Sequence, residues 1–155
     1  MTPRRSRIFC ALCLVACFTL FASSCSDSTL NQVAKAEADI NAACAATFTV
    51  VAQANAANPP LISNSDAAAI IQVLLQIEQG NRQAETATGQ ISSLNATNSA
   101  SILTVLAPIE TAVNNAVANG TVNIKDPSTK TKVQTALVTI QTLLNSTVAL
   151  LQAVK

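Results

Sequence analysis

The sequence predicts an all-α protein, an up-and-down four-helix bundle preceded by an N-terminal signal helix. Two observations carry this prediction. Apolar residues recur at steps of three and four over four long stretches that are poor in Gly and Pro, as amphipathic helices require. Before them, an uncharged apolar stretch follows a basic start, which is the pattern of an export signal. We therefore divide the chain into a signal peptide, residues 1–24, and a helical bundle domain, residues 25–155.

The leader combines a basic start, an apolar middle and a small-residue exit. Arg4, Arg5 and Arg7 precede residues 8–22, which read IFCALCLVACFTLFA and carry no charge. We expect the arginines to stay on the cytoplasmic side while the apolar stretch enters the membrane. After Cys25 the chain turns polar. The mature part should therefore be exported.

This leader resembles the signal of bacterial lipoprotein precursors, over residues 1–25 only. Such signals end in a box of about Leu, small, small, Cys, and the Cys becomes the lipidated first residue of the mature chain. The sequence ASSC ends in Cys25 at the apolar-to-polar boundary, although Ala22 stands where the box has Leu. The sequence LVAC ends in Cys17 and matches the letters better, but the apolar run continues past it. The resemblance implies lipid attachment at Cys25, with Cys17 as the alternative.

Two other fates of the leader remain open. Cleavage by an ordinary signal peptidase would release a soluble periplasmic or secreted chain. Alternatively, residues 8–25 could remain as an uncleaved anchor, because eighteen residues are near the lower limit for spanning a bilayer. All of these fates place the remaining chain outside the cytoplasm, in the cell envelope or beyond it.

The first predicted helix covers residues 29–58, which contain no Gly or Pro. Alanine, the best helix former, is frequent here. The helix should end at Asn58, because a residue that precedes proline disfavours the helical conformation. One face carries the apolar stripe Leu30, Val33, Ile40, Cys44, Thr47 and Val51, which Glu37 interrupts.

The second helix is expected to begin among residues 63–66 (SNSD), which supply N-cap candidates, and to end near Gly89. A third helix is expected within residues 90–118, with a kink at Pro108, because proline removes one backbone hydrogen bond and clashes with the preceding turn. Residues 119–120 (Asn-Gly) are a stop signal.

The fourth helix is expected after an extended connection over residues 121–125. Asp126 and Pro127 form an N-cap followed by proline at the first helical position. The helix then runs to the end of the chain, because no Gly or Pro follows Pro127. Its apolar stripe is Val133, Leu137, Ile140, Leu144, Leu151 and Val154.

The chain offers little material for catalysis, and we expect no enzyme, no catalytic residue, no cofactor and no metal site. It contains no His, which removes imidazole bases and ligands. Glu37 is the unusual acid, because an inward carboxylate could serve as a ligand or a base with a raised pKa. The alternative, which we favour, is that Glu37 reaches solvent at the bundle edge. Cys44 is expected to be a buried small hydrophobe.

The distribution of charged residues limits the kinds of partner that the chain is expected to bind. A net charge of +1 gives no basic surface for nucleic acid. Residues 86–109 and 133–154 carry no charge at all. These uncharged helix faces are either weakly polar surface or a site for self-association, a protein partner or a membrane surface. The sequence thus predicts a membrane-anchored cell-envelope lipoprotein with a structural or interaction role. The alternative is a soluble secreted helical module that binds an apolar ligand or a partner.

Overall fold

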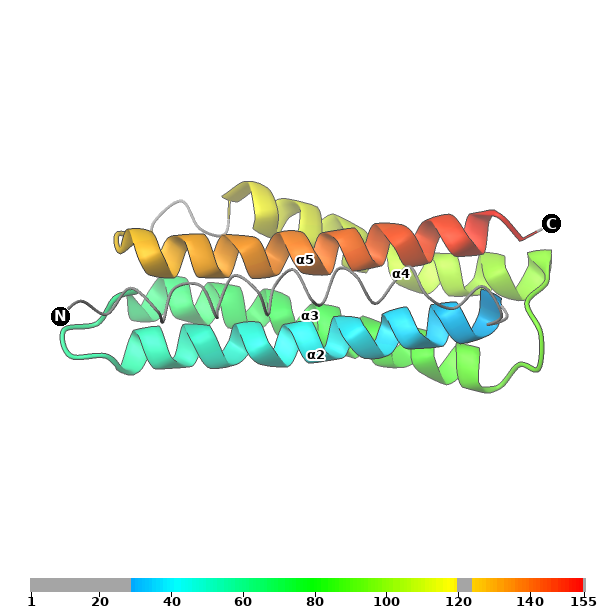
Figure 1. Cartoon of the computed structure of the whole chain (residues 1–155), viewed down its shortest axis with the longest axis horizontal. Helices are drawn as coiled ribbons and strands as arrows, with labels where there is room; N and C mark the ends of the chain where they lie inside the picture. The colour runs from blue at the N-terminus through cyan, green and yellow to red at the C-terminus, as the bar shows by residue number, and fades with distance from the viewer. Residues whose placement is uncertain (1–28, 120–123, 155) are drawn as a thin grey trace, which may run out of the picture.

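The computed structural model describes residues 29–119 and 124–154, and this part of the chain is all-helical (Figure 1). It contains four helices and no strand within those ranges. The prediction of an all-α helical bundle is confirmed there, whereas the expected signal helix lies outside the described residues. The helices are α2 (Thr29–Ala56), α3 (Asn64–Gly89), α4 (Ala96–Asn119) and α5 (Pro127–Gln152).

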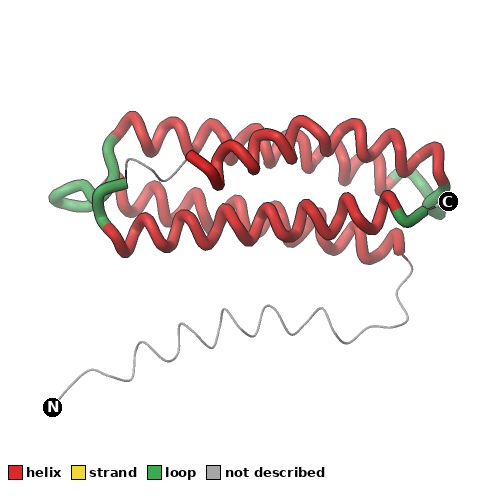
Figure 2. Tube along the Cα trace, turned by 90° about the horizontal axis from the view of Figure 1, so that it is seen from above, coloured by secondary structure: helices red, strands yellow, loops and turns green. Residues whose placement is uncertain are grey.

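Each helix lies beside two others. α2 packs against α3 and α5, and α4 packs against the same two helices. Consecutive helices run in opposite directions along one long axis, and the connections lie at the two ends (Figures 1 and 2). The four helices therefore enclose one core.

That core is built from one stripe per helix, in which steps of three and four residues alternate. Such a stripe stays on one side of a helix over its whole length. The stripe positions, all buried, are Val33, Glu37, Ile40, Cys44, Thr47, Val51 and Ala54 on α2; Ala67, Ile70, Leu74, Ile77, Asn81, Ala84 and Thr88 on α3; Ser99, Ile102, Leu106, Ile109, Val113 and Ala116 on α4; and Val133, Leu137, Ile140, Leu144, Thr147 and Leu151 on α5. Ala36, Thr129 and Leu143 are buried beside these stripes.

Most of the predicted helix boundaries agree with the structure. The Ser63 hydroxyl accepts a hydrogen bond from the backbone N–H of Asp66, and Ser63 is the N-cap of α3. Asp126 caps α5, and its carboxylate accepts the backbone N–H of Thr129 at 2.7 Å. Hydrogen bonds from the side chain and the backbone N–H of Thr129 lower the pKa of Asp126. α3 ends at Gly89, as expected.

Two helix boundaries lie inside the residue ranges that the sequence indicates. α2 ends at Ala56, and the segment that contains both prolines turns back, so that the backbone N–H of Leu61 donates to the carbonyl of Ala54. α4 begins only at Ala96, where Asn95 and Asn98 exchange side-chain and backbone hydrogen bonds. Pro108 does not end α4; it lies on the exposed side of the helix. The kink expected there stays a prediction.

At Gly80, α3 lies close to a side chain of α4. A Cβ atom built on Gly80 would lie 2.6 Å from both Cγ1 and Cδ1 of Ile109. Ile109 is buried in the core, so its side chain has little room to withdraw. Glycine at this position is therefore a packing requirement of the helix pair rather than a break in α3, which continues nine residues further.

We predict that Gly80→Ala lowers the stability of the bundle. The overpacking cost of about 1–3 kcal/mol should exceed the gain of about 1 kcal/mol in helix propensity. Gly89→Ala is the matched control, because nothing lies within 4 Å of its added Cβ. Urea unfolding of both variants, of Ile109→Ala and of the Gly80→Ala/Ile109→Ala pair measures the coupling. Strictly additive effects would contradict the contact, because removing the Ile109 side chain should relieve the clash.

Candidate functional site

The chemically unusual feature of the bundle is a buried carboxyl group. Glu37 is 1% exposed and is the only charged side chain that is buried among the described residues. The other buried polar residues of that part of the chain are neutral: Thr47, Asn81, Thr88, Ser99, Thr129 and Thr147. A buried acid needs hydrogen-bond partners or a proton, because desolvation disfavours its charge.

A connected set of side chains between α2 and α3 supplies the partners. The Thr88 hydroxyl donates to Glu37 Oε1 at 2.8 Å. The Asn81 side-chain amide donates to the Glu37 backbone carbonyl at 2.7 Å and to Asn41 Oδ1 at 2.9 Å. The Asn41 amide donates to Glu85 Oε1 at 2.7 Å. We call these five residues, Glu37, Asn41, Asn81, Glu85 and Thr88, the polar cluster.

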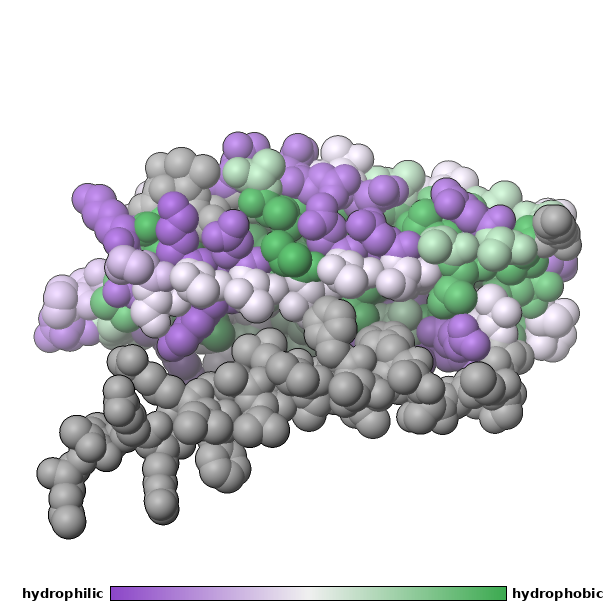
Figure 3. Space-filling view, turned by 45° about the horizontal axis from the view of Figure 1, so that its top comes forward, coloured by the Kyte–Doolittle hydropathy of each residue, from purple (hydrophilic) through white to green (hydrophobic). Residues whose placement is uncertain are grey.

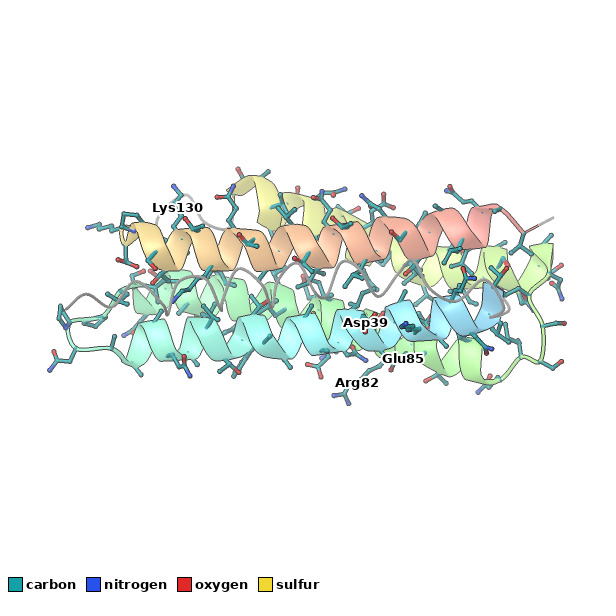
Figure 4. The ribbon with its side chains drawn as sticks, in the orientation of Figure 1. Asp39, Arg82, Glu85 and Lys130 are labelled. Atoms are coloured by element: carbon teal, nitrogen blue, oxygen red, sulfur yellow. The ribbon has the colours of Figure 1, made fainter. Side chains whose placement is uncertain are left out.

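Helix geometry explains why these residues meet. Glu37 and Asn41 are four residues apart on α2, and Asn81, Glu85 and Thr88 follow at steps of four and three on α3, so each group lies on one helix face. α2 and α3 are antiparallel neighbours, which brings the two faces together. The cluster extends from the buried Glu37 to the half-buried Glu85, whose position beside α2 is visible in Figure 4.

Burial changes the acidity of Glu37. Its pKa rises from 4.5 to about 7, mainly because burial removes water from the charged form. The hydrogen bond from Thr88 opposes this rise, and the nearby carboxylate of Glu85 adds to it. Glu37 therefore keeps its proton to a higher pH than a solvent-exposed glutamate does. A pKa rise of this size corresponds to about 3 kcal/mol of cost when the group ionises in the folded protein.

One acceptor in the polar cluster has no donor. Asn81 is 1% exposed, and its Oδ1 atom has no hydrogen-bond partner among the described residues. The orientation of this amide is fixed, because exchanging its nitrogen and oxygen would point an acceptor at two other acceptors. A proton on Glu37 adds a donor to a cluster that has this unused buried acceptor.

The sequence-based expectation for Glu37 is wrong in its favoured form. Glu37 does not reach solvent at the bundle edge; the helix keeps it on the inner stripe, between Val33 and Ile40. Asn81 and Thr88 were missed as site residues. Both continue the inner stripe of α3 beyond Ile77, so this spacing was a usable signal for their burial.

A carboxyl group with a pKa near 7 has the acidity of a general base. Here, however, the side chain is closed off from solvent, and its hydrogen-bond partner is the hydroxyl of Thr88. No group of three or more His, Cys, Asp or Glu side chains among the described residues could hold a metal ion. The chemistry that this geometry supports is the uptake and release of a proton within the bundle.

Cys44 lies on the same stripe as Glu37 and is buried, which confirms the expectation of a small core residue. Burial, with a smaller contribution from Glu78, raises the pKa of its thiol to about 12. The thiol is therefore uncharged at physiological pH and unreactive while α2 is in place.

A pocket of about 420 Å³ lies at the end of the bundle where α2 begins and α5 ends. Its lining comes from these two helix ends and the α3–α4 loop: Thr29, Leu30, Ser92, Ser93, Leu94, Leu150, Ala153 and Val154.

Cys25 and Cys17, the two candidate lipid-attachment residues, lie outside the described residues. No protein-family model, curated protein or solved structure matches the chain.

We predict that Thr88→Val destabilises the bundle more at pH 8 than at pH 5. At pH 8 the lost hydrogen bond is to an ionised carboxylate and should cost about 1.5–3 kcal/mol, whereas a bond between neutral groups contributes about 1 kcal/mol. Thr86→Val is the matched control, because the exposed Thr86 hydroxyl bonds only the Arg82 carbonyl of its own helix. Urea unfolding at the two pH values measures both variants, and an equal loss at both would contradict a bond to the Glu37 carboxylate.

Proposed function

We propose that this protein is an exported cell-envelope lipoprotein without catalytic activity. In this proposal lipid on Cys25 anchors it to a membrane, and residues 25–155 form an up-and-down four-helix bundle with a structural or protein-interaction role. The observation that carries the proposal is the leader, in which a basic start, an uncharged apolar stretch and a Cys at the polar boundary follow in order. The all-helical architecture of the described residues supports the second part.

The distance between the proposed anchor and the bundle is short. α2 begins at Thr29, so three residues separate Cys25 from the first helical residue. Even a fully extended chain covers about 14 Å over those four steps. Acyl chains on Cys25 would contribute about 0.8 kcal/mol per buried CH₂ group and hold the bundle close to the lipid surface.

The outer sides of α4 and α5 support an interaction role. Residues 97, 100, 104, 107, 111, 114 and 118 of α4 are exposed or half-buried and are Thr, Ala or Asn, without a charge. On the face drawn in Figure 3, hydrophilic and hydrophobic areas alternate and do not separate into two sides. Such a surface can approach another copy or a protein partner without desolvating charges.

Hydrogen bonds within each helix lower the desolvation cost of covering the exposed hydroxyl groups with a partner. The hydroxyls of Thr104, Thr111 and Thr142 each donate to the backbone carbonyl four residues earlier, at 2.9, 3.2 and 2.9 Å. A donor already bonded within its own helix stays satisfied when a partner covers it. By contrast, an exposed hydroxyl that relies on water would lose its partner on burial.

By length and composition alone, α4 and α5 are also apolar enough to cross a membrane, with a mean hydropathy of 1.2 over an 18-residue stretch of each. Both helices contribute a full stripe to the core, however, and core helices commonly have such a composition. We therefore base the membrane attachment on Cys25 and not on these two helices.

A soluble secreted module that binds an apolar ligand is the second candidate. The pocket at the end of the bundle favours it, because Leu30, Leu94 and Leu150 present apolar side chains there and its volume lies in the range of small-molecule sites. In this alternative the leader is cleaved without lipidation.

We predict that Cys25→Ser releases the protein from the membrane fraction and removes the acyl mass from the mature N-terminus. Serine has no thiol for the thioether-linked lipid, whereas the rest of the leader is unchanged. Cys17→Ser is the matched control and should leave both the mass and the membrane partition as in the wild type. Membrane fractionation and intact mass spectrometry are the measurements.

Three outcomes would contradict the proposal. If Cys17→Ser, and not Cys25→Ser, released the protein from the membrane fraction, the lipid would be attached to Cys17. A wild-type mature chain that starts at Cys25, carries no acyl mass and is soluble would support the secreted module. A full-length product in the cytosol would contradict export itself.

A further inference from the structure

The polar cluster interrupts an otherwise apolar contact between α2 and α3. Beyond it, the inner stripes of both helices are aliphatic side chains, alanine, Cys44 and a threonine, Thr47, whose hydroxyl bonds its own helix at 2.7 Å. Glu37 has no such solution within its helix, because a carboxylate cannot donate to a backbone carbonyl. Its side chain is bonded across the helix contact, to Thr88 of α3. The protonation state of the Glu37 carboxyl group therefore affects the contact between α2 and α3.

No cation of the described residues is among the groups that shift the pKa of Glu37. The charged group that acts on Glu37 is the carboxylate of Glu85 on α3, and it opposes ionisation. Arg82 on the same helix is paired with Glu78 at the surface. On α5, the other neighbour of α2, residues 133–154 are uncharged, and Lys130 lies toward the opposite end of the bundle (Figure 4). On α2 itself, Lys35 is exposed and Asp39 is a further acid.

We propose that the polar cluster is a proton-sensitive contact between α2 and α3, which is closed when Glu37 is protonated and loosened when Glu37 is ionised. Protonation removes the repulsion by Glu85 and the cost of a charge in this buried site. It also adds a donor to a polar cluster in which the buried Asn81 Oδ1 has no partner among the described residues. Ionisation leaves a carboxylate with one hydroxyl donor in a buried site. This contact does not depend on the leader or on lipid attachment.

The direction of the pH effect follows from the two states of the carboxyl group. In an open or unfolded chain Glu37 is solvated and loses its proton near pH 4.5, whereas in the closed bundle it keeps the proton to about pH 7. The closed state therefore binds more protons between these values, and closure weakens as the pH rises through this interval. Above about pH 7 Glu37 is ionised in both the closed and the open state, so the stability of the closed state no longer falls as the pH rises.

Cys44 provides a probe of this opening that is already present in the chain. It lies two helical turns from Glu37 on the same face of α2 and is 3% exposed, so a thiol reagent reaches it only when α2 moves away. Trypsin cleavage after Lys35 and Arg82 yields a peptide, residues 36–82, in which Cys44 is the only cysteine. Mass spectrometry of this peptide thus reports labelling of Cys44 in the whole protein, whatever happens at the leader cysteines.

The test compares N-ethylmaleimide labelling rates of Cys44 in the wild type and in Glu37→Gln between pH 4.5 and pH 8.5. The glutamine side chain keeps an acceptor for Thr88 but does not ionise, and the ratio of the two rates cancels the intrinsic pH dependence of thiol chemistry. We expect a ratio near one at pH 4.5 and an increase to about tenfold or more above pH 7, since each pKa difference of one unit contributes a factor of ten.

Glu85→Gln is a second variant that keeps an acceptor for Asn41 and removes the neighbouring charge. Relative to Glu37→Gln it should show a smaller increase that levels off at a lower pH, because the repulsion that favours protonated Glu37 is gone. A rate ratio that stays constant from pH 4.5 to pH 8.5 would overturn the proposal. An unchanged response in Glu85→Gln would overturn the part assigned to Glu85.

Discussion

The alternation of three- and four-residue steps along all four helices is the constraint on which the rest of the structure depends. Each helix is only weakly amphipathic, because Ala, Thr and other uncharged residues such as Gln occupy much of its outer surface. No single helix of this kind is stable by itself, since helical stability in proteins comes mostly from packing of one face. The four stripes bury one another, and small residues such as Ala36, Ala84 and Gly80 allow the helix axes to come close.

The same spacing buries the polar residues that lie on the stripes, and these residues then need hydrogen-bond partners inside the bundle. Thr47 and Thr147 are fully buried, yet each hydroxyl donates to a carbonyl one turn earlier and needs nothing from another helix. Glu37 and Asn81 cannot be satisfied in this way, and their hydrogen bonds cross from one helix to the other. Because a shift of α3 by one turn would separate these partners, the cluster fixes the axial position of α3 against α2. Buried polar groups often have this role in helical assemblies.

The sequence was sufficient for the features that depend on local chemistry. The Asp126 cap, the end of α3 at Gly89 and the inner stripes all follow from residue types and spacing along one helix. The depth of Glu37 could not be obtained in the same way, because the rotation of α2 about its axis is set by the surfaces of α3 and α5. The same holds for Gly80, which looks like a weak point in an isolated helix and is a contact point with Ile109 once α4 is in place.

The choice of residue at position 37 shows what a carboxyl group adds. A leucine there would fill the space but remove the acceptor that the Thr88 hydroxyl has across the helix contact. A glutamine would accept the same hydrogen bond and stay neutral at every pH. Glutamate forms that bond too, yet it introduces a cost that appears only when its proton leaves. Among these three side chains, only glutamate makes the contact between α2 and α3 respond to pH. A bundle held outside the cytoplasm would experience the pH of its surroundings directly.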